Sequence, residues 1–264
     1  MLRAASRILR NPRHLFGHRN IFLFSHMRAN TSLFGHILGS HPDIEGYYEM
    51  HIGYYSWKSL WRQKFLYLEN HSFKPSSYIF FDKLLHDYCV VSQEILARSS
   101  THSIFMLRSP EKSIKSTVSL YRKNQPEHEY AQVSGATKYY TDRVQKLANI
   151  AKTMRRQYYY LDAEDLIKHP VETLASLSAW LNLSQPLVPE YQTFSKTGTP
   201  QAGDNSELIK SGTINQRQHD YSHINLDAAA LAAAEAIYLE SRNSLIIGSA
   251  VGPAVPDVSV NVSE

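Results

Sequence analysis

Two segments that share one local pattern constrain this chain more than any other feature. The first covers residues 21–38 and the second covers residues 104–120. Each has a short apolar run, then a turn that carries an arginine, then a helical pattern that bears hydroxyl side chains. A strand that leads into a helix presents free backbone N–H groups and the positive end of the helix dipole to an anion. The pair therefore predicts a ligand with phosphate groups at both ends of a nucleoside.

Apolar runs alternate with helical patterns along most of the chain. Strands are predicted over residues 20–24, 77–81, 104–107 and 158–161, and helices over residues 32–39, 136–157 and 227–242 and from Pro110 and Pro170. This alternation predicts an α/β fold with a P-loop-like, mostly parallel sheet and helices on both faces. Ligands of such sheets bind beyond the carboxyl ends of the strands. Arg28, Lys83 and Arg108 are each expected just past a strand end, so they should converge on one site.

The domain organisation follows from where a core pattern is present. A chain of 264 residues can build one sizeable α/β core. We expect one domain over residues 20–247, a basic leading segment over residues 1–19 and a disordered tail over residues 248–264. The arginines of the leading segment are Arg3, Arg7, Arg10, Arg13 and Arg19. Its loosely amphipathic pattern fits a solvated helix packed on the domain, or else a segment for peripheral membrane contact or organelle targeting.

Composition narrows the choice of ligand and compartment. The net charge is +4 and the pI is near 9.0, which suits an anionic small ligand, a nucleic acid or an acidic membrane face. The single cysteine, Cys89, excludes an internal disulfide and favours a reduced, cytoplasmic compartment. Because Cys89 lies in an apolar run, we interpret it as a buried thiol rather than a nucleophile. No apolar run in the sequence reaches the roughly 20 residues that span a bilayer.

The two phosphate-binding segments resemble motifs of the sulfotransferases that use 3′-phosphoadenosine 5′-phosphosulfate (PAPS). The sequence Arg108-Ser-Pro, with Ser116 eight residues after the arginine, matches the family's 3′-phosphate motif Arg-x-Pro…Ser. Residues 25–33, SHMRANTSL, resemble its 5′-phosphosulfate loop, Ser-x-Pro-Arg-Ser-Gly-Thr-Thr/Ser-Leu-Leu. The departures are Met27 for proline and Asn30 for glycine. Asparagine tolerates the left-handed conformation that glycine allows, so we expect a positive φ at Asn30.

Later segments extend the resemblance to about residue 225. Residues 160–174 and 180–183 are similar to the family's Tyr-Glu-Asp-Leu…Pro…Leu…Leu-Gly-Leu stretch, and residues 203–214 resemble the loop that closes over PAPS in bacterial members. The resemblance implies that PAPS is the co-substrate and that the late loop closes over it. The residues that it assigns to PAPS are Arg28, Ala29, Asn30, Thr31, Ser32, Arg108, Ser116, Ser206, Lys210, Ser211 and Gly212.

Sulfuryl transfer also needs a base for the acceptor proton and cations for the developing charge. Family members that act on sugars or tyrosine place a catalytic glutamate after the first helix, where Glu49 lies; a surface glutamate is the alternative. His51 is the competing base, because an unperturbed imidazole titrates near neutral pH. His86 is a third candidate and equally fits a structural role.

The cation at the transferring group is expected to be Lys83, aided by Arg28. Lys83 resembles the family lysine that contacts this group, and an ordinary lysine at a strand end is the alternative. The other histidines have no metal-ligand spacing, so no metal is predicted.

These observations predict a PAPS-dependent sulfotransferase, and a glutamate base favours a hydroxyl of a carbohydrate or glycolipid as acceptor. The aromatic residues 47–73 would form either core or the wall of the acceptor cleft. The alternative is a noncatalytic nucleotide-binding protein that keeps the phosphate sites and has lost the chemistry. Nucleic-acid binding is disfavoured, because the chain has no recognised binding motif.

Overall fold

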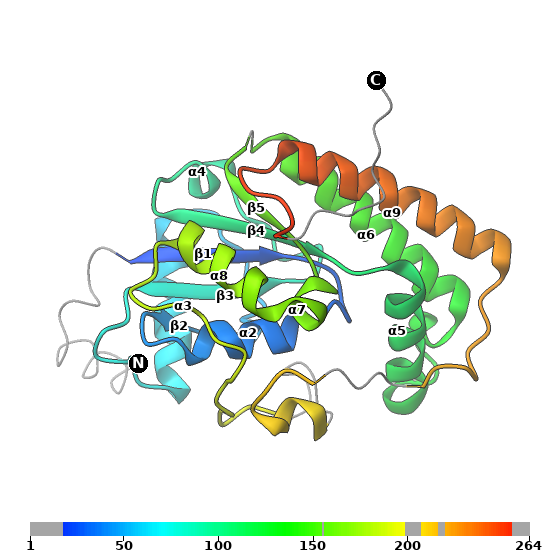
Figure 1. The fold of residues 1–264 in the computed structure, drawn as a ribbon, viewed down its shortest axis with the longest axis horizontal. Helices are drawn as coiled ribbons and strands as arrows, with labels where there is room; N and C mark the ends of the chain where they lie inside the picture. Colours follow the sequence, from blue (N-terminus) through cyan, green and yellow to red (C-terminus); the bar gives the residue numbers. More distant parts are fainter. Residues whose placement is uncertain (1–17, 155, 199–206, 216–219, 255–264) are drawn as a thin grey trace.

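The computed structural model describes residues 18–154, 156–198, 207–215 and 220–254 (Figure 1). Within these ranges five strands form one sheet in the order β2-β3-β1-β4-β5, and every neighbouring pair is parallel. The strands are β1 (Arg19–Phe24), β2 (Ile44–Glu45), β3 (Ile79–Leu84), β4 (Thr101–Leu107) and β5 (Tyr158–Asp162). The expected α/β fold with a parallel sheet is confirmed.

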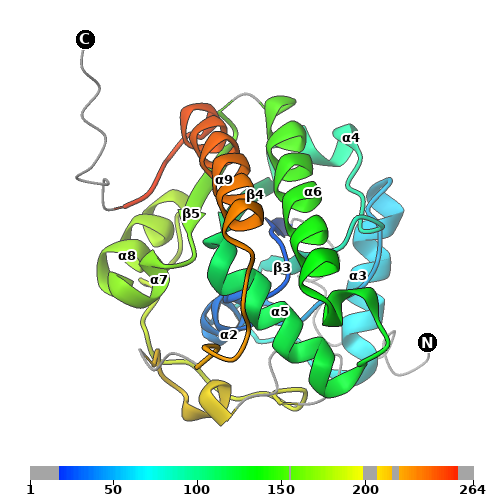
Figure 2. The same ribbon diagram turned by 90° about the vertical axis from the view of Figure 1, so that its right-hand side faces the viewer.

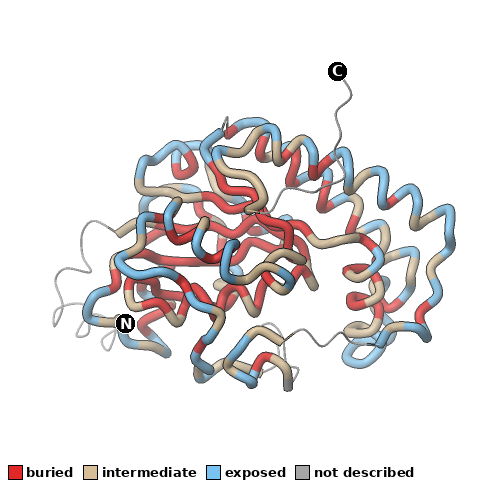
Figure 3. Tube along the Cα trace, viewed as in Figure 1, coloured by how far each residue is buried: buried red, intermediate tan, exposed pale blue. Residues whose placement is uncertain are grey.

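Helices cover both faces of the sheet, which explains why its strands are almost continuously apolar. They are α2 (Thr31–Ser40), α3 (Trp57–Asn70), α4 (Gln93–Leu96), α5 (Pro110–Asn124), α6 (Val133–Lys152), α7 (Asp165–Lys168), α8 (Pro170–Leu181) and α9 (Ala228–Gly248), with the 3-10 turns η2 (Glu129–Ala131) and η3 (Glu207–Ser211). Helices α6 and α9 lie side by side (Figures 1 and 2). The sheet is therefore buried between two helical layers (Figure 3).

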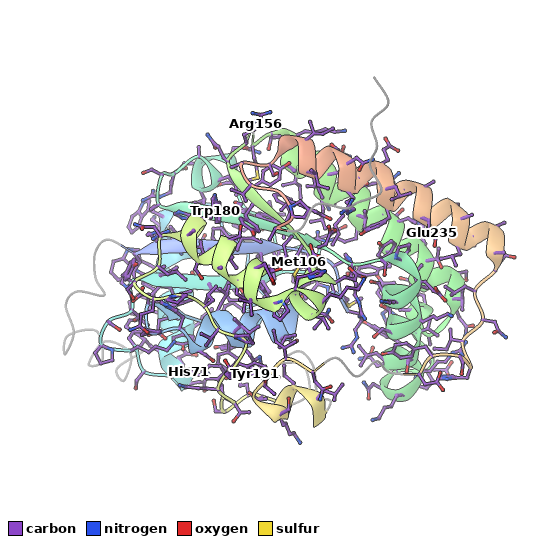
Figure 4. The ribbon with its side chains drawn as sticks, viewed as in Figure 1. His71, Met106, Arg156, Trp180, Tyr191 and Glu235 are labelled. Atoms are coloured by element: carbon purple, nitrogen blue, oxygen red, sulfur yellow. The ribbon has the colours of Figure 1, made fainter. Side chains whose placement is uncertain are left out.

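Alternate residues of β1 supply two separate cores. Phe22 and Phe24 of β1 pack in the core that contains residues of α5, α6 and α9. Ile21 and Leu23 point the other way, into the core that contains residues of α2 and α8. Met106 of β4, labelled in Figure 4, belongs to this second core. Both faces of the central strands are thus fixed by burial, which holds their carboxyl ends in place.

Strand β3 is longer than expected and takes in two charged residues. It was predicted to end at Phe81, but it continues to Leu84 because all six of its residues pair in register with β1. Lys83 is therefore a buried strand residue opposite Leu23, and its predicted place beyond the strand end is wrong. Arg28 and Arg108 do follow the ends of their strands, as expected.

The structure describes several residues at both ends of the predicted domain. Helix α9 extends to Gly248, and Val251 then bridges to Tyr159 while its carbonyl accepts from the amide of Tyr160 at 2.9 Å. The expected tail is thus wrong for residues 248–251. Arg19 already belongs to β1, whereas the leading arginines Arg3, Arg7, Arg10 and Arg13 lie outside the described residues.

None of the helices among the described residues is both long enough and apolar enough to cross a bilayer.

Candidate active site

The turn between β1 and α2 contains two left-handed residues and leads into a helix N-terminus. Asn30 has φ 57° and Arg28 has φ 63°, so both residues are left-handed. The expected positive φ at Asn30 is confirmed. The Asn30 side chain does not cap α2; its amide donates to the carbonyl of Ala163 at 3.2 Å. The N-terminus of α2, with Thr31 and Ser32 in its first turn, therefore carries no side-chain cap and suits an anion.

This geometry predicts opposite effects for two substitutions of Asn30. Asn30→Gly should be tolerated, because glycine adopts a positive φ without strain and loses only one long hydrogen bond. Asn30→Val should cost about 1–3 kcal/mol of strain, since a β-branched side chain is disfavoured there. We expect the valine variant to bind 3′-phosphoadenosine 5′-phosphate (PAP) more weakly and to melt at a lower temperature. Wild-type PAP affinity in this variant, measured by calorimetry, would show that the turn does not bind the nucleotide.

The two predicted phosphate segments meet directly. The Nε of Arg28 donates to the Oγ of Ser116 on α5 at 2.8 Å. In return, the Nη1 of Arg108 donates to the backbone carbonyl of Arg28 at 2.8 Å. The hydroxyl of Tyr221 also donates to Ser116 Oγ, at 3.0 Å. Ser116 accepts from two donors, so its own hydroxyl proton is available to a ligand.

Arg108 has a buried nitrogen that the described protein leaves unsatisfied. Its Nε is buried from solvent and has no hydrogen-bond partner among the described residues. Burial lowers the pKa of Arg108, which the nearby carboxylate of Glu164 opposes and the charge of Arg28 reinforces. Arginine remains a cation through such shifts. A buried, unpaired guanidinium N–H is costly, and an anionic oxygen would satisfy it.

Two residues hold the backbone of Arg108 and Ser109 in place, and the sequence did not identify either of them. His26 accepts from the amide of Arg108 through Nε2 at 3.1 Å, which places its own proton on Nδ1, 2.9 Å from the carbonyl of Met27. Burial lowers the pKa of His26 to about 3, so the ring is neutral and this tautomer is retained. Glu164 accepts from the amide and the hydroxyl of Ser109, at 3.1 and 2.7 Å. The Ser109 hydroxyl therefore binds Glu164 rather than capping α5.

The candidate base and cation gather beside the end of β3. Lys83 Nζ lies 3.7 Å from Oε1 of Glu49, and the Lys83 side chain is fully buried. His86 Nε2 lies 3.5 Å from Oε2 of Glu49, and His51 Nδ1 lies 4.0 Å from the same oxygen. Burial raises the pKa of Glu49, but the contact with His86 and the charges of Lys83 and the histidines outweigh it and lower the pKa. Glu49 is therefore ionised at neutral pH and can accept a proton.

Asp82 fixes the segment that carries Glu49. Its Oδ1 accepts from the amides of Met50 and Lys83, at 3.0 and 2.8 Å, and its Oδ2 accepts from the hydroxyl of Tyr54 at 2.6 Å. Burial raises the pKa of Asp82 to about 7 even though these three donors act to lower it. Asp82 thus links the loop after β2 to β3. In the sequence, this role is marked only by the presence of an acidic residue next to Lys83 in an apolar run.

The aromatic residues 47–73 divide between core and surface. Tyr47, Tyr48, Tyr54 and Tyr67 are buried, whereas Tyr55 and Trp57 are exposed. The side chains of this segment thus contribute mainly to the hydrophobic core. An exposed ring from outside this segment lies against the two histidines that are near Glu49: Tyr88 stacks on His86 with 5.2 Å between ring centroids, and its hydroxyl lies 2.9 Å from His51 Nδ1.

The late loop is described only in part. Ser206 lies outside the described residues. Lys210 is exposed, Ser211 Oγ donates within its own loop to Leu208, and Gly212 has φ 73°. The Gly212 carbonyl accepts from the amide of Tyr191, the residue labelled beside this loop in Figure 4. Tyr221, which sequence reasoning did not single out, is the residue from this half of the chain that contacts Ser116.

Two solved structures with a similar fold are sulfotransferase domains. The chain superposes on the sulfotransferase domain of the curacin biosynthetic pathway with a TM-score of 0.54 and 16% identity, covering 84% of this chain and 97% of that one. For the sulfotransferase domain of the olefin synthase of Synechococcus PCC 7002, the TM-score is 0.52 and the identity 13%, with 84% and 95% covered. No family model and no curated protein sequence matches the chain. At these identities the comparison establishes the fold.

Proposed function

We propose that the protein is a sulfotransferase that moves a sulfuryl group from PAPS to an acceptor hydroxyl. The observation that carries this proposal is the junction of Arg28, Ser116 and Arg108. Two segments of the chain meet there through paired hydrogen bonds and leave one buried guanidinium nitrogen unsatisfied among the described residues. A phosphate oxygen has the charge and the acceptor capacity to satisfy it.

The residues divide between binding and transfer. Arg108 and Ser116 would bind the 3′-phosphate, and Arg28, Ala29, Asn30, Thr31 and Ser32 would hold the 5′-phosphosulfate on the N-terminus of α2. PAPS supplies the sulfuryl group, which leaves its phosphate oxygen and bonds to the acceptor oxygen. Glu49 would take the acceptor proton, and the cation of Lys83 would stabilise the charge that develops on the oxygens in transfer.

The arrangement around Glu49 supports a hydroxyl acceptor. Glu49 is only 10% exposed, and the rings of His86 and Tyr88 lie beside it in a parallel stack. Aromatic faces next to a carboxylate base suit a sugar ring, whose C–H groups pack on the rings while its hydroxyl reaches the base. We therefore propose a carbohydrate or glycolipid as acceptor class.

Two assays separate this function from its noncatalytic alternative. Calorimetry with PAP tests nucleotide binding, and transfer of radiolabelled sulfate from PAPS to sugars, glycolipids and phenols tests the chemistry. We expect PAP to bind and sulfate to appear on a sugar hydroxyl. PAP binding without transfer to any acceptor would indicate a nucleotide-binding protein that has lost its chemistry. If PAP does not bind, the assignment of both phosphate sites is wrong.

A further inference from the structure

The proposed base and two histidines beside it form a cluster, and the proposed transfer reaction gives these two histidines no role. They are Glu49, His51 and His86, whose possible ligand atoms all lie within 4.8 Å of one another. Oε2 of Glu49 is the shared vertex, 3.5 Å from Nε2 of His86 and 4.0 Å from Nδ1 of His51. Around tetrahedral zinc, with bonds of about 2.0–2.1 Å, neighbouring ligand atoms are separated by about 3.3 Å. To hold such an ion, the distances of 3.5 and 4.0 Å to Glu49 would have to shorten to about 3.3 Å, and the widest separation, at most 4.8 Å, would have to shorten by up to about 1.5 Å.

The side chains of the cluster differ in exposure to solvent, and both histidines contact Tyr88. The exposed fractions of the side chains rise from 10% for Glu49 to 28% for His86 and 42% for His51. His86 is held by the stack with Tyr88, and His51 by its contact with the Tyr88 hydroxyl. The least buried ligand, His51, would make the largest movement and would exchange its contact with Tyr88 for one with the metal.

The donor set indicates which ions would bind. Two imidazole nitrogens and one carboxylate oxygen suit zinc, cobalt and related transition metals, whereas magnesium and calcium prefer oxygen ligands. Lys83 faces the other oxygen of the Glu49 carboxylate at 3.7 Å. The positive charge of Lys83 repels a cation in the cluster, so we expect Lys83 to lower the affinity of the cluster for a metal ion.

We propose that Glu49, His51 and His86 form a site for zinc-like divalent ions, and that the bound ion inhibits the transferase by occupying the base. When the ion is bound, the Glu49 carboxylate coordinates the metal and can no longer take the proton of the acceptor hydroxyl. Metal binding is argued from the cluster alone, whereas the inhibitory effect rests on the proposed function.

Cobalt(II) absorption in the visible range tests the binding directly and needs no transferase activity. We expect the full-length protein to bind one cobalt ion here and zinc to displace it. His86→Ala and His51→Ala should each weaken cobalt binding at least tenfold. Lys83→Met should tighten it several-fold, because a neighbouring cation is removed. Unchanged cobalt affinity in both histidine variants would overturn the site.

Controls are needed because the chain has 13 histidines. The matched control is His223→Ala, an exposed histidine outside the cluster, which should leave the cobalt spectrum unchanged. Magnesium at the same concentration should not displace cobalt; displacement would show a site built on oxygen ligands instead.

Inhibition is tested separately, with each variant compared with its own metal-free rate. Zinc should slow the wild-type enzyme, a chelator should restore the rate, and His86→Ala should require at least tenfold more zinc. If cobalt binds at the cluster but zinc leaves the rate unchanged, the inhibitory part is wrong. If no transfer from PAPS occurs at all while cobalt binds, the proposed function fails and the metal site stands.

Discussion

Replacing Glu49 with glutamine should lower the rate of sulfuryl transfer about 10²–10⁴-fold, the usual cost of losing a general base. Glutamine is nearly isosteric with glutamate but cannot take the acceptor proton. Because Glu49 lies beside Lys83 and His86 rather than in the phosphate junction, PAP affinity should stay at the wild-type value. The measurements are single-turnover transfer rates and PAP calorimetry on the same variant.

The competing bases supply the controls for this prediction. His51 is the most exposed of the three candidates, with its side chain 42% accessible, and it contacts the hydroxyl of Tyr88. His51→Gln and His86→Gln should therefore reduce the rate much less than Glu49→Gln. If His51→Gln is the inactive variant and Glu49→Gln retains its rate, then His51 is the base.

Local sequence signals were sufficient for four of the five strands and for the arginine-bearing turns that follow β1 and β4, whereas the two-residue strand β2 was not predicted. The strands have residues buried on both faces, so their apolar runs stand out, and the turns that follow carry the arginines. The positive φ at Asn30 could also be anticipated, because few residues other than glycine and asparagine tolerate it. These features depend on neighbours in the chain, and the sequence displays them directly.

Features that depend on distant partners could not be read in the same way. Strand β3 was predicted too short because Asp82 and Lys83 are charged, and a buried charge is tolerated only with partners. Those partners, among them Tyr54 and Glu49, come from another part of the chain. The contact of Tyr221 with Ser116 spans 105 residues, and no local pattern marks it.

Arg108 should decide the preference between nucleotides with and without a 3′-phosphate. The wild-type protein should bind PAP far more tightly than AMP, because the two ligands differ by the group that Arg108 and Ser116 would bind. Arg108→Ala should remove most of this preference, at a cost of about 2–4 kcal/mol in PAP binding, as for other truncations of buried charged partners. AMP affinity should change much less. Calorimetry with both nucleotides on both proteins measures the four affinities.

The structural role of Arg108 must be separated from its role in binding. Its Nη1 donates to the carbonyl of Arg28, so Arg108→Ala also removes a bond that supports the turn. Loss of that support would weaken AMP and PAP alike and lower the melting temperature, whereas loss of a phosphate contact affects PAP selectively. Lys123→Ala, an exposed cation in the last turn of α5, controls for the change in net charge. Equal affinity of the wild-type protein for PAP and AMP would show that the unsatisfied nitrogen of Arg108 does not bind a 3′-phosphate.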